Sequence, residues 1–227
     1  MIRIENELCP TSEQMEFIIR GMRNPMNSWD KMDSHDTAGL FFLGEKDKQL
    51  MKKLAKAGTD HRKFMRMISV YVDITAPLYW WKEFDTYKVG TVANSCSTMH
   101  KIAEKEFTLD DFSHEHLIIR QSVDILKETI DVLNVFRNVY LEGGAVSLDH
   151  GNTAEPVAYP PKSKDIWWQM IQLLPSSYNQ KRSVMLNYEV LANMYKSRKN
   201  HKLDEWRDFC KWMEDLPFSY LITGEGE

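Results

Sequence analysis

The 227-residue sequence carries 29 lysines and arginines against 33 aspartates and glutamates, a net charge of −4, and 43% of its residues are apolar. Because charges of both signs are interspersed, the composition predicts no basic footprint for nucleic acid and no charged patch for a membrane surface. We therefore expect a small-molecule partner. The length favours a single domain spanning residues 1–227.

The cysteines and histidines favour neither a disulfide framework nor a metal site. Three cysteines lie far apart without a CxxC pair, and the histidines outside the motifs described below are scattered; these are His35, His100, His114, His116 and His150. The N-terminus is charged where a signal peptide would be apolar, and no run of about 18 apolar residues occurs. We expect a cytoplasmic protein that neither spans a membrane nor is exported.

The first third of the chain predicts two helices and a clear strand. In chain order we expect an edge strand at 1–8, a helix from Thr11 to Arg20, an irregular stretch at 24–43, a helix at 45–57 and a strand at 66–75. Thr11 and Gln14 have the spacing of a capping box. The strand at 66–75 alternates branched apolar residues with polar ones, which predicts one buried face, formed by Ile68, Val70, Val72 and Ile74.

The rest of the chain predicts mainly helices. We expect helices from Pro77 to Val89, at 115–140, 165–174, 178–200 and 203–215, with a loop from Gly143 to Lys164. The helix at 115–140 has a broad apolar face at helical spacing, made by Ile118, Ile125, Leu126, Ile130, Leu133, Phe136 and Tyr140. Together these elements predict an α/β (α+β) domain, with a small β-sheet and several long helices.

The sequence contains no P-loop, GxGxxG, HExxH or nucleophile elbow. The stretch VDITAPLYWWKEFDTYKVGT nevertheless resembles the centre of the flavin-dependent thymidylate synthases. In that family a strand ends in Ala-Pro, an amphipathic helix follows, and a glutamine precedes the signature RHRxxSxNxxSxR. The glutamine aligns with Glu83, and the signature aligns with Thr86, Tyr87, Lys88, Thr91, Ala93, Cys96 and Thr98.

Two further segments carry the same resemblance. His61 lies fifteen residues before Ala76, where the family has a histidine that contacts the flavin. The segment NYEVLANMYKSR places Asn187, Asn193 and Arg198 at the offsets of two asparagines and an arginine of the family. The chain continues with HKLDEW, where His201 and Glu205 resemble the family's following helix if one residue is deleted. The resemblance thus covers about 61–98 and 183–206.

The resemblance implies a reaction and a set of roles. The reaction is reductive transfer of one carbon to C5 of a deoxyuridine nucleotide, with FAD, and with methylenetetrahydrofolate and NADPH as further reactants. The implied roles are Arg198 for catalysis, His61, Lys88, Asn187 and Asn193 for FAD, and Glu83, Tyr87, Thr91, Cys96, Thr98 and Arg198 for the nucleotide. The family's shared sites imply a homo-oligomer, a tetramer. Cys96 is not expected to act as an attacking thiol.

Departures from the family pattern leave alternatives open. Thr86, Thr98 and Glu189 stand where the family has basic residues, and each lost arginine–phosphate contact costs on the order of 1.5–3 kcal/mol. A diverged enzyme and a non-catalytic nucleotide-binding homologue both agree with this pattern. A third alternative is an interaction protein, because aromatic residues are dense from Tyr79 to Phe84. A buried helix core accounts for these aromatics better than a base-stacking platform does.

Overall fold

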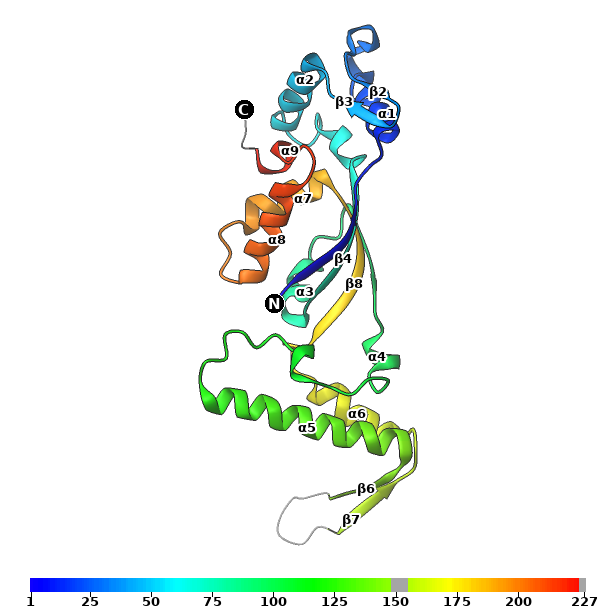
Figure 1. The fold of residues 1–227 in the computed structure, drawn as a ribbon, viewed down its shortest axis with the longest axis vertical. Helices are drawn as coiled ribbons and strands as arrows, with labels where there is room; N and C mark the ends of the chain where they lie inside the picture. The colour runs from blue at the N-terminus through cyan, green and yellow to red at the C-terminus, as the bar shows by residue number, and fades with distance from the viewer. Residues whose placement is uncertain (148–154, 225–227) are drawn as a thin grey trace. The chain divides into compact units, whose positions relative to one another are not determined.

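A computed structural model describes residues 1–147 and 155–224 (Figure 1). The chain forms two compact units, each assembled from separate segments. We call Ile2–Thr75, Trp80–Asn94 and Lys181–Glu227 the sheet unit, and Met1, Ala76–Tyr79 and Ser95–Gln180 the α5 unit. That the whole chain is one domain stays a prediction.

The sheet unit contains most of the strands. It contains the whole of β1 (Arg3–Leu8), α1 (Ser12–Met22), β2 (His35–Thr37), β3 (Leu40–Phe42), α2 (Glu45–Lys56), α7 (Tyr188–Arg198), α8 (Asp204–Asp215) and α9 (Tyr220–Thr223). It also contains most of four further elements, which are β4 (Ser69–Pro77), α3 (Leu78–Phe84), β5 (Thr91–Ser95) and β8 (Asn179–Asn187). Short 3-10 turns occupy Asn24–Met26, Trp29–Lys31 and Lys63–Arg66.

Four strands form the main sheet in the order β1-β4-β8-β5. The edge strand β1 pairs antiparallel with β4, with Arg3 opposite Thr75, and the register shifts between Glu5 and Leu8. The strand predicted at 66–75 is present as β4, which starts later, at Ser69. Val70, Val72 and Ile74 of β4 are buried, as is Ile68 directly before it, which confirms the predicted period-two pattern. The alternation of apolar and polar residues therefore fixed the central strand correctly.

An aromatic cluster packs α3 against α8. Trp80, Trp81 and Phe84 are buried, and the Trp80 ring centroid lies 4.8 Å from that of Trp206 and 5.5 Å from that of Phe209. The aromatics of α3 are thus core residues, as expected, although Tyr79 is half-buried. The predicted helix to Val89 was too long: α3 ends at Phe84, where the chain turns and the Thr86 hydroxyl donates to the Glu83 carbonyl at 2.7 Å.

The predicted helix at 178–200 was wrong in its first half. Residues Asn179–Asn187 form β8, and α7 begins at Tyr188. Val184 and Leu186 are buried two positions apart, which is a strand period that the flanking charged residues obscured. Helices α7, α8 and α9 then contact one another beside the sheet (Figure 1).

At the N-terminal end, α1 begins with the predicted capping box, in which Thr11 Oγ1 accepts from the Gln14 amide at 3.3 Å. The predicted irregular stretch at 24–43 instead includes the hairpin of β2 and β3. The expected helix at 45–57 is present as α2 and ends before Gly58, whose φ is +96°.

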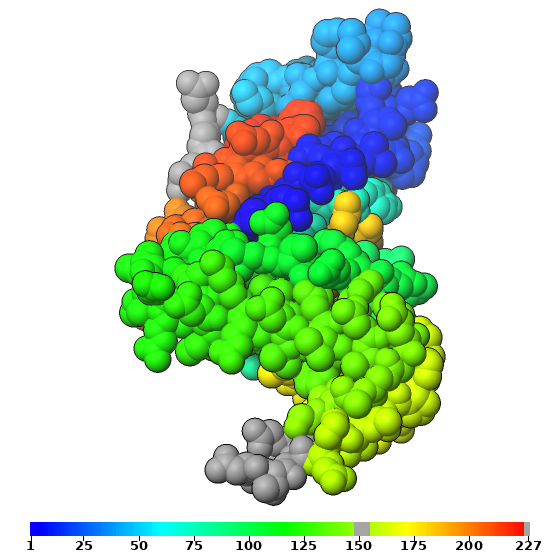
Figure 2. Space-filling model, turned by 60° about the horizontal axis from the view of Figure 1, so that its bottom comes forward, coloured from blue at the N-terminus to red at the C-terminus, as the bar shows by residue number. Residues whose placement is uncertain are grey.

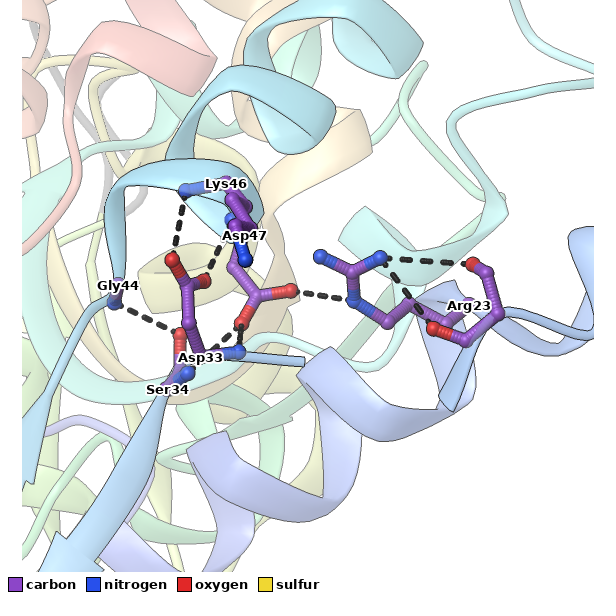
Figure 3. A network of polar contacts seen from close by, with 7 residues as sticks. Arg23, Asp33, Ser34, Gly44, Lys46 and Asp47 are labelled. Atoms are coloured by element: carbon purple, nitrogen blue, oxygen red, sulfur yellow. Dashed lines mark hydrogen bonds and ion pairs between the residues drawn. The ribbon is translucent and has the colours of Figure 1, made fainter. Parts of the chain in front are cut away.

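A buried ion pair fixes the start of α2 (Figure 3). Arg23 Nε donates to Asp47 Oδ1 at 2.6 Å, and both side chains are almost fully buried. Asp47 Oδ2 accepts from the backbone amides of Asp33 at 3.0 Å and Ser34 at 2.8 Å. The Asp33 carboxylate in turn accepts from the amides of Lys46 at 2.9 Å and Asp47 at 3.0 Å. The bonds to Asp33 satisfy two backbone donors of the first turn of α2, and the bonds to Asp47 tie the preceding loop to the helix.

The α5 unit is a helical pair with a hairpin. Its elements are α4 (Thr98–Lys101), the 3-10 turn Leu109–Asp111, α5 (Arg120–Glu142), β6 (Gly144–Ser147), β7 (Pro156–Tyr159) and α6 (Lys164–Leu173). Helices α5 and α6 pack together around buried apolar residues that include Phe112, Leu126, Leu133 and Met170.

The predicted apolar face of α5 was partly wrong. Leu126, Ile130 and Leu133 are buried, but Ile118 is 91% exposed and precedes the helix, and Ile125 is 55% exposed. Figure 2 shows α5 and the segment before it in green.

The predicted loop at 143–164 contains a hairpin instead, because β6 and β7 pair antiparallel from Gly144 opposite Tyr159 to Ser147 opposite Pro156. His150 lies outside the described residues.

Helices and small sheets together confirm the predicted α/β (α+β) class. No helix in residues 1–147 and 155–224 is long and apolar enough to cross a membrane. Within the same ranges, no group of three or more His, Cys, Asp or Glu side chains is placed to hold a metal ion.

Candidate functional site

Three residues predicted to bind the nucleotide meet in the sheet unit. Arg198, the last residue of α7, donates from Nε to the Tyr87 hydroxyl at 3.0 Å and from Nη1 to Glu83 Oε2 at 2.7 Å. Glu83 lies on α3, and Tyr87 lies in the turn that follows it. The side chains of Arg198 and Glu83 are 19% and 34% exposed, so the pair is shielded yet reachable from solvent. We call Arg198, Glu83, Tyr87 and Trp206 the Arg198 cluster.

Trp206 of α8 completes the cluster. Its indole Nε1 donates to the same Glu83 Oε2 at 2.8 Å, and the Arg198 guanidinium lies 4.8 Å from its ring centroid. A guanidinium above an aromatic face is attracted to the ring's negative face. Since Trp206 is fully buried, it holds both charged groups in place.

One side of the Arg198–Glu83 pair is open. In the part of the chain that the structure describes, no hydrogen bond reaches Glu83 Oε1 or Arg198 Nη2. The pair therefore presents an acceptor beside a donor. His201 Nε2 lies 3.5 Å from Glu83 Oε2 and adds a further polar group at this edge.

Asn187 has a structural role next to the cluster. Its side-chain Oδ1 accepts from the Val190 backbone amide at 3.0 Å, which caps the start of α7. Its backbone amide donates to the Gly90 carbonyl at 3.3 Å. Gly90 has φ +83°, and a Cβ there would lie 2.4 Å from Asn187 Nδ2. The Thr91 hydroxyl donates to the Tyr87 carbonyl. Gly90 and Thr91 thus fix the turn that carries Tyr87.

A second polar cluster surrounds Glu189 on α7. Arg62 donates from Nε to Glu189 Oε1 at 3.2 Å and from Nη2 to Asn193 Oδ1 at 3.0 Å, and Arg66 also pairs with Glu189. Burial works to raise the pKa of Glu189, but the bonds from Arg66 and Arg62 hold that pKa below its ordinary value. The acid at position 189 is therefore compensated by two arginines that precede β4.

His61 lines a cavity of about 570 Å³ in the sheet unit. The walls are mostly apolar and include Met22, Leu54, Phe64 and Met67. A volume in the range of about 300–1,000 Å³ with apolar walls and few polar groups is typical of a small-molecule pocket. Lys88, the remaining residue predicted to bind the cofactor, is exposed.

The last two predicted nucleotide-binding residues belong to the α5 unit. Gln180 Nε2 donates to the Cys96 carbonyl at 3.0 Å and to Thr98 Oγ1 at 2.8 Å. The structure brings Glu83, Tyr87 and Arg198 together in the sheet unit, and it brings Cys96 and Thr98 together in the α5 unit.

The other two thiols are poor nucleophiles. Burial raises the pKa of Cys210 to about 11, and burial together with Glu7 raises the pKa of Cys9 to about 12. Both thiols are therefore protonated at neutral pH. All three cysteines are free.

Sequence reasoning missed Trp206, Arg62 and Arg66. Arg62 directly follows the predicted His61, and its spacing to Arg66 is one helical turn, so a pair of arginines facing an acid could have been suspected. Trp206 carried no such signal, because its contact with Glu83 joins residues that are 123 positions apart.

Comparison with known proteins places the fold. No family model matches the sequence, and no curated protein matches it. A crystal structure of the flavin-dependent thymidylate synthase ThyX from Helicobacter pylori, complexed with FAD and dUMP, matches 99% of this chain and 97% of its own, with a TM-score of 0.60 and 13% identity. A second structure of that protein with FAD and dUMP matches with a TM-score of 0.60 and 14% identity, over 99% and 96% of the two chains.

A third similar structure is the UMP/dUMP methylase PolB from Streptomyces cacaoi, bound with 5-Br UMP. It matches 94% of this chain and 88% of its own, with a TM-score of 0.56 and 13% identity. The predicted resemblance is confirmed at the level of the fold: this chain has the fold of the flavin-dependent thymidylate synthases.

Proposed function

We propose that the protein binds FAD and a pyrimidine nucleotide, and transfers one carbon reductively to C5 of a deoxyuridine nucleotide. The open edge of the Arg198–Glu83 pair carries this proposal. The fold supports it, because the similar solved structures hold FAD with dUMP, or 5-Br UMP.

The open edge matches the chemistry of a uracil ring. Uracil presents a carbonyl oxygen next to the N3–H group, which is an acceptor beside a donor. Arg198 Nη2 donates to the carbonyl, and Glu83 Oε1 accepts from N3–H. Since Trp206 and Tyr87 already hold the pair, little side-chain freedom is lost when the base binds.

The cavity beside His61 suits the flavin ring. Its apolar walls offer dispersion contacts to a flat ring, and His61 supplies a polar group at its edge. Asn193, whose side-chain oxygen accepts from Arg62, offers its side-chain NH2 group to the cofactor, and the exposed Lys88 offers a positive charge. Reduced flavin supplies the hydride of the reaction, and methylenetetrahydrofolate supplies the carbon.

Arg198 has a further role in the chemical step. C5 of the pyrimidine is nucleophilic as part of an enolate, whose negative charge is shared with the neighbouring ring carbonyl oxygen, and a fixed guanidinium would stabilise that charge as it forms. The guanidinium is positively charged at any working pH, so this stabilisation does not depend on a proton transfer.

A non-catalytic nucleotide-binding homologue is the second candidate. The observation that favours it is the ion pair itself, because the Glu83 carboxylate offsets the charge that Arg198 offers to an anionic ligand. Thr86 and Thr98 add no positive charge. Both candidates bind a nucleotide, and only turnover separates them.

We also propose that copies of this chain associate into a homotetramer in the cytoplasm. The exposed apolar residues Ile118, Ile119 and Ile125, at 91%, 65% and 55% exposure, support an interface with a second copy. The free cysteines favour a reducing compartment.

Light scattering tests the tetramer. It should give four times the 26.7 kDa chain mass, and substitution of Ile125 by Lys should lower that mass. A monomeric wild-type protein would contradict the tetramer.

The deciding experiment for the activity has two stages. First, the visible absorption spectrum is recorded with and without added FAD, since bound oxidised flavin is coloured. Second, dUMP and dCMP are titrated calorimetrically, and dUMP is then incubated with reduced flavin and methylenetetrahydrofolate. Methylated product supports the enzyme, whereas dUMP binding without product supports the non-catalytic homologue.

The control variants are matched in charge. Arg198→Gln should weaken dUMP binding at least tenfold, because a hydrogen bond to a charged group contributes about 1.5–3 kcal/mol. Arg20→Gln removes an arginine at an exposed position of α1, and should leave dUMP affinity unchanged. Equal losses in both variants, or no binding of FAD or dUMP by the wild-type protein, would contradict the proposal.

A further inference from the structure

A small positively charged pocket lies between α2, α7 and α9, three helices that lie close together in the sheet unit (Figure 1). Its volume is about 230 Å³. Five of its lining side chains are cationic, namely Lys52, Lys56, Arg62, Lys196 and Lys199. We call this site the lysine pocket.

The charge of the lysine pocket opposes that of the chain. The protein carries a net charge of −4, yet no Asp or Glu is among the described residues that line the pocket. The remaining lining residues are apolar or neutral, and they include Ala192, Tyr220 and Leu221. Clustered charges of one sign in a concave surface focus the field and attract a ligand of opposite charge.

Two of the cations are held in place before any ligand binds. Arg62 is held by Glu189 at 3.2 Å and Asn193 at 3.0 Å. The ammonium of Lys52 lies 5.2 Å from the ring centroid of Tyr220. A preorganised cation loses less conformational freedom on binding.

The size of the pocket limits the ligand. A pocket for a whole cofactor or drug-sized molecule has a volume of about 300–1,000 Å³, so about 230 Å³ suits a compact group. The like charges of Lys52, Lys56 and Lys196 repel each other, and an anion bound between them would relieve that repulsion. We propose that the lysine pocket binds a compact polyanion, which is either the phosphate chain of a small phosphorylated ligand or a chain of carboxylates. This site is separate from the Arg198 cluster and from the cavity beside His61, and it does not depend on the proposed function.

The test measures binding of tripolyphosphate, citrate and orthophosphate to the full chain by isothermal titration calorimetry. We expect one site per chain, with tripolyphosphate or citrate at least tenfold tighter than orthophosphate. Tighter binding of tripolyphosphate would identify the ligand as a phosphate chain, and tighter binding of citrate would identify it as a carboxylate ligand. The triple variant K52Q/K56Q/K196Q should lose affinity about 100-fold or more, because each lost charge-assisted bond contributes about tenfold. Arg62 is kept in that variant, since it also pairs with Glu189.

The control is K48Q/K127Q/K202Q, which removes the same charge from lysines that do not line the pocket. This control should keep affinity within about threefold, and circular dichroism should show both variants folded. A similar loss in both variants, absence of a single site, or displacement of the polyanion by saturating FAD would overturn the proposal. The last outcome would make the pocket part of the flavin site.

Discussion

At the scale of single residues, the central feature is a carboxylate that shares an arginine with the expected ligand. Glu83 occupies the position where the family that the sequence resembles has a neutral glutamine, and here it binds Arg198 and Trp206 through the same oxygen. A glutamine could keep one acceptor but would not offset the guanidinium charge.

We therefore expect Glu83→Gln to bind dUMP about tenfold more weakly, equivalent to about 1.4 kcal/mol, because Arg198 and Trp206 donate to one oxygen of Glu83 while the uracil N3–H donates to the other, and a glutamine keeps only one of these acceptors. Asp85→Asn is the matched control, since Asp85 also pairs with an arginine, Arg182 at 2.7 Å, near the end of α3. Calorimetric titration of both variants measures the effect. An equal loss in both variants, or tighter binding by Glu83→Gln, would mean that overall charge, and not the Arg198 cluster, sets the affinity.

Asn187 lies at the junction of β8 and α7, where its side chain caps the helix. Asn187→Ala removes the acceptor for the Val190 amide and should lower the free energy of unfolding by about 1 kcal/mol. Urea denaturation measures this change. Ser183→Ala, on an exposed position of β8, removes a hydroxyl bonded to Asp73 at 2.5 Å and should cost less. A stable Asn187→Ala protein would show that the cap contributes nothing to stability.

The pairing of Glu189 with Arg62 and Arg66 predicts acid sensitivity. The folded-state pKa of Glu189 is lowered, so its contribution to stability is fully present above the unfolded pKa, about 4.3, and is lost as the pH falls through the folded value. In Glu189→Gln, the free energy of unfolding should therefore fall less between pH 6 and pH 3 than in the wild-type protein. Glu106→Gln, at an exposed position, should keep the wild-type slope. Identical slopes for all three proteins would contradict the coupling.

At the scale of elements, the start of α2 depends on one buried ion pair and the loop that precedes it (Figure 3). Asp47→Asn leaves the buried Arg23 charge without its counterion, and removing one partner of such a pair costs about 3–5 kcal/mol. Asp30→Asn, in the exposed 3-10 turn Trp29–Lys31, should change stability by less than about 0.5 kcal/mol. Thermal unfolding compares them, and a small effect at position 47 would show that water or another group reaches Arg23.

Elements whose residues follow a regular apolar–polar alternation or a capping motif could be predicted from sequence. Elements in which charged residues interrupt that alternation could not. The alternation from Val70 to Ile74 predicted β4, and the capping box at Thr11 predicted the start of α1. In β8, charged residues in the first half hid the strand period, although Asn187 before Tyr188 is a common helix-start signal. Ile118 and Ile125 were assigned to the core because spacing alone cannot tell an apolar residue that packs from one left exposed.

At the scale of the whole molecule, the fold was predicted from a resemblance in two short segments, and the solved structures confirm it over 99% of the chain. The Arg198 cluster could be anticipated as far as Glu83, Tyr87 and Arg198. Trp206 could not, and neither could the choice of Glu189 as the partner of Arg62 and Arg66, since these contacts join distant parts of the chain. The roles of the site residues stay predictions until ligands are measured.

The burial of Trp206 under the Arg198 guanidinium has an optical consequence. Indole emission responds to nearby charge, and it is quenched by energy transfer to a coloured acceptor such as flavin. The protein has seven tryptophans, so the difference in emission between the wild-type protein and Trp206→Phe isolates the signal of this one ring. Trp206 is thus a native fluorophore within the Arg198 cluster, and it allows ligand arrival there to be followed in real time without a label.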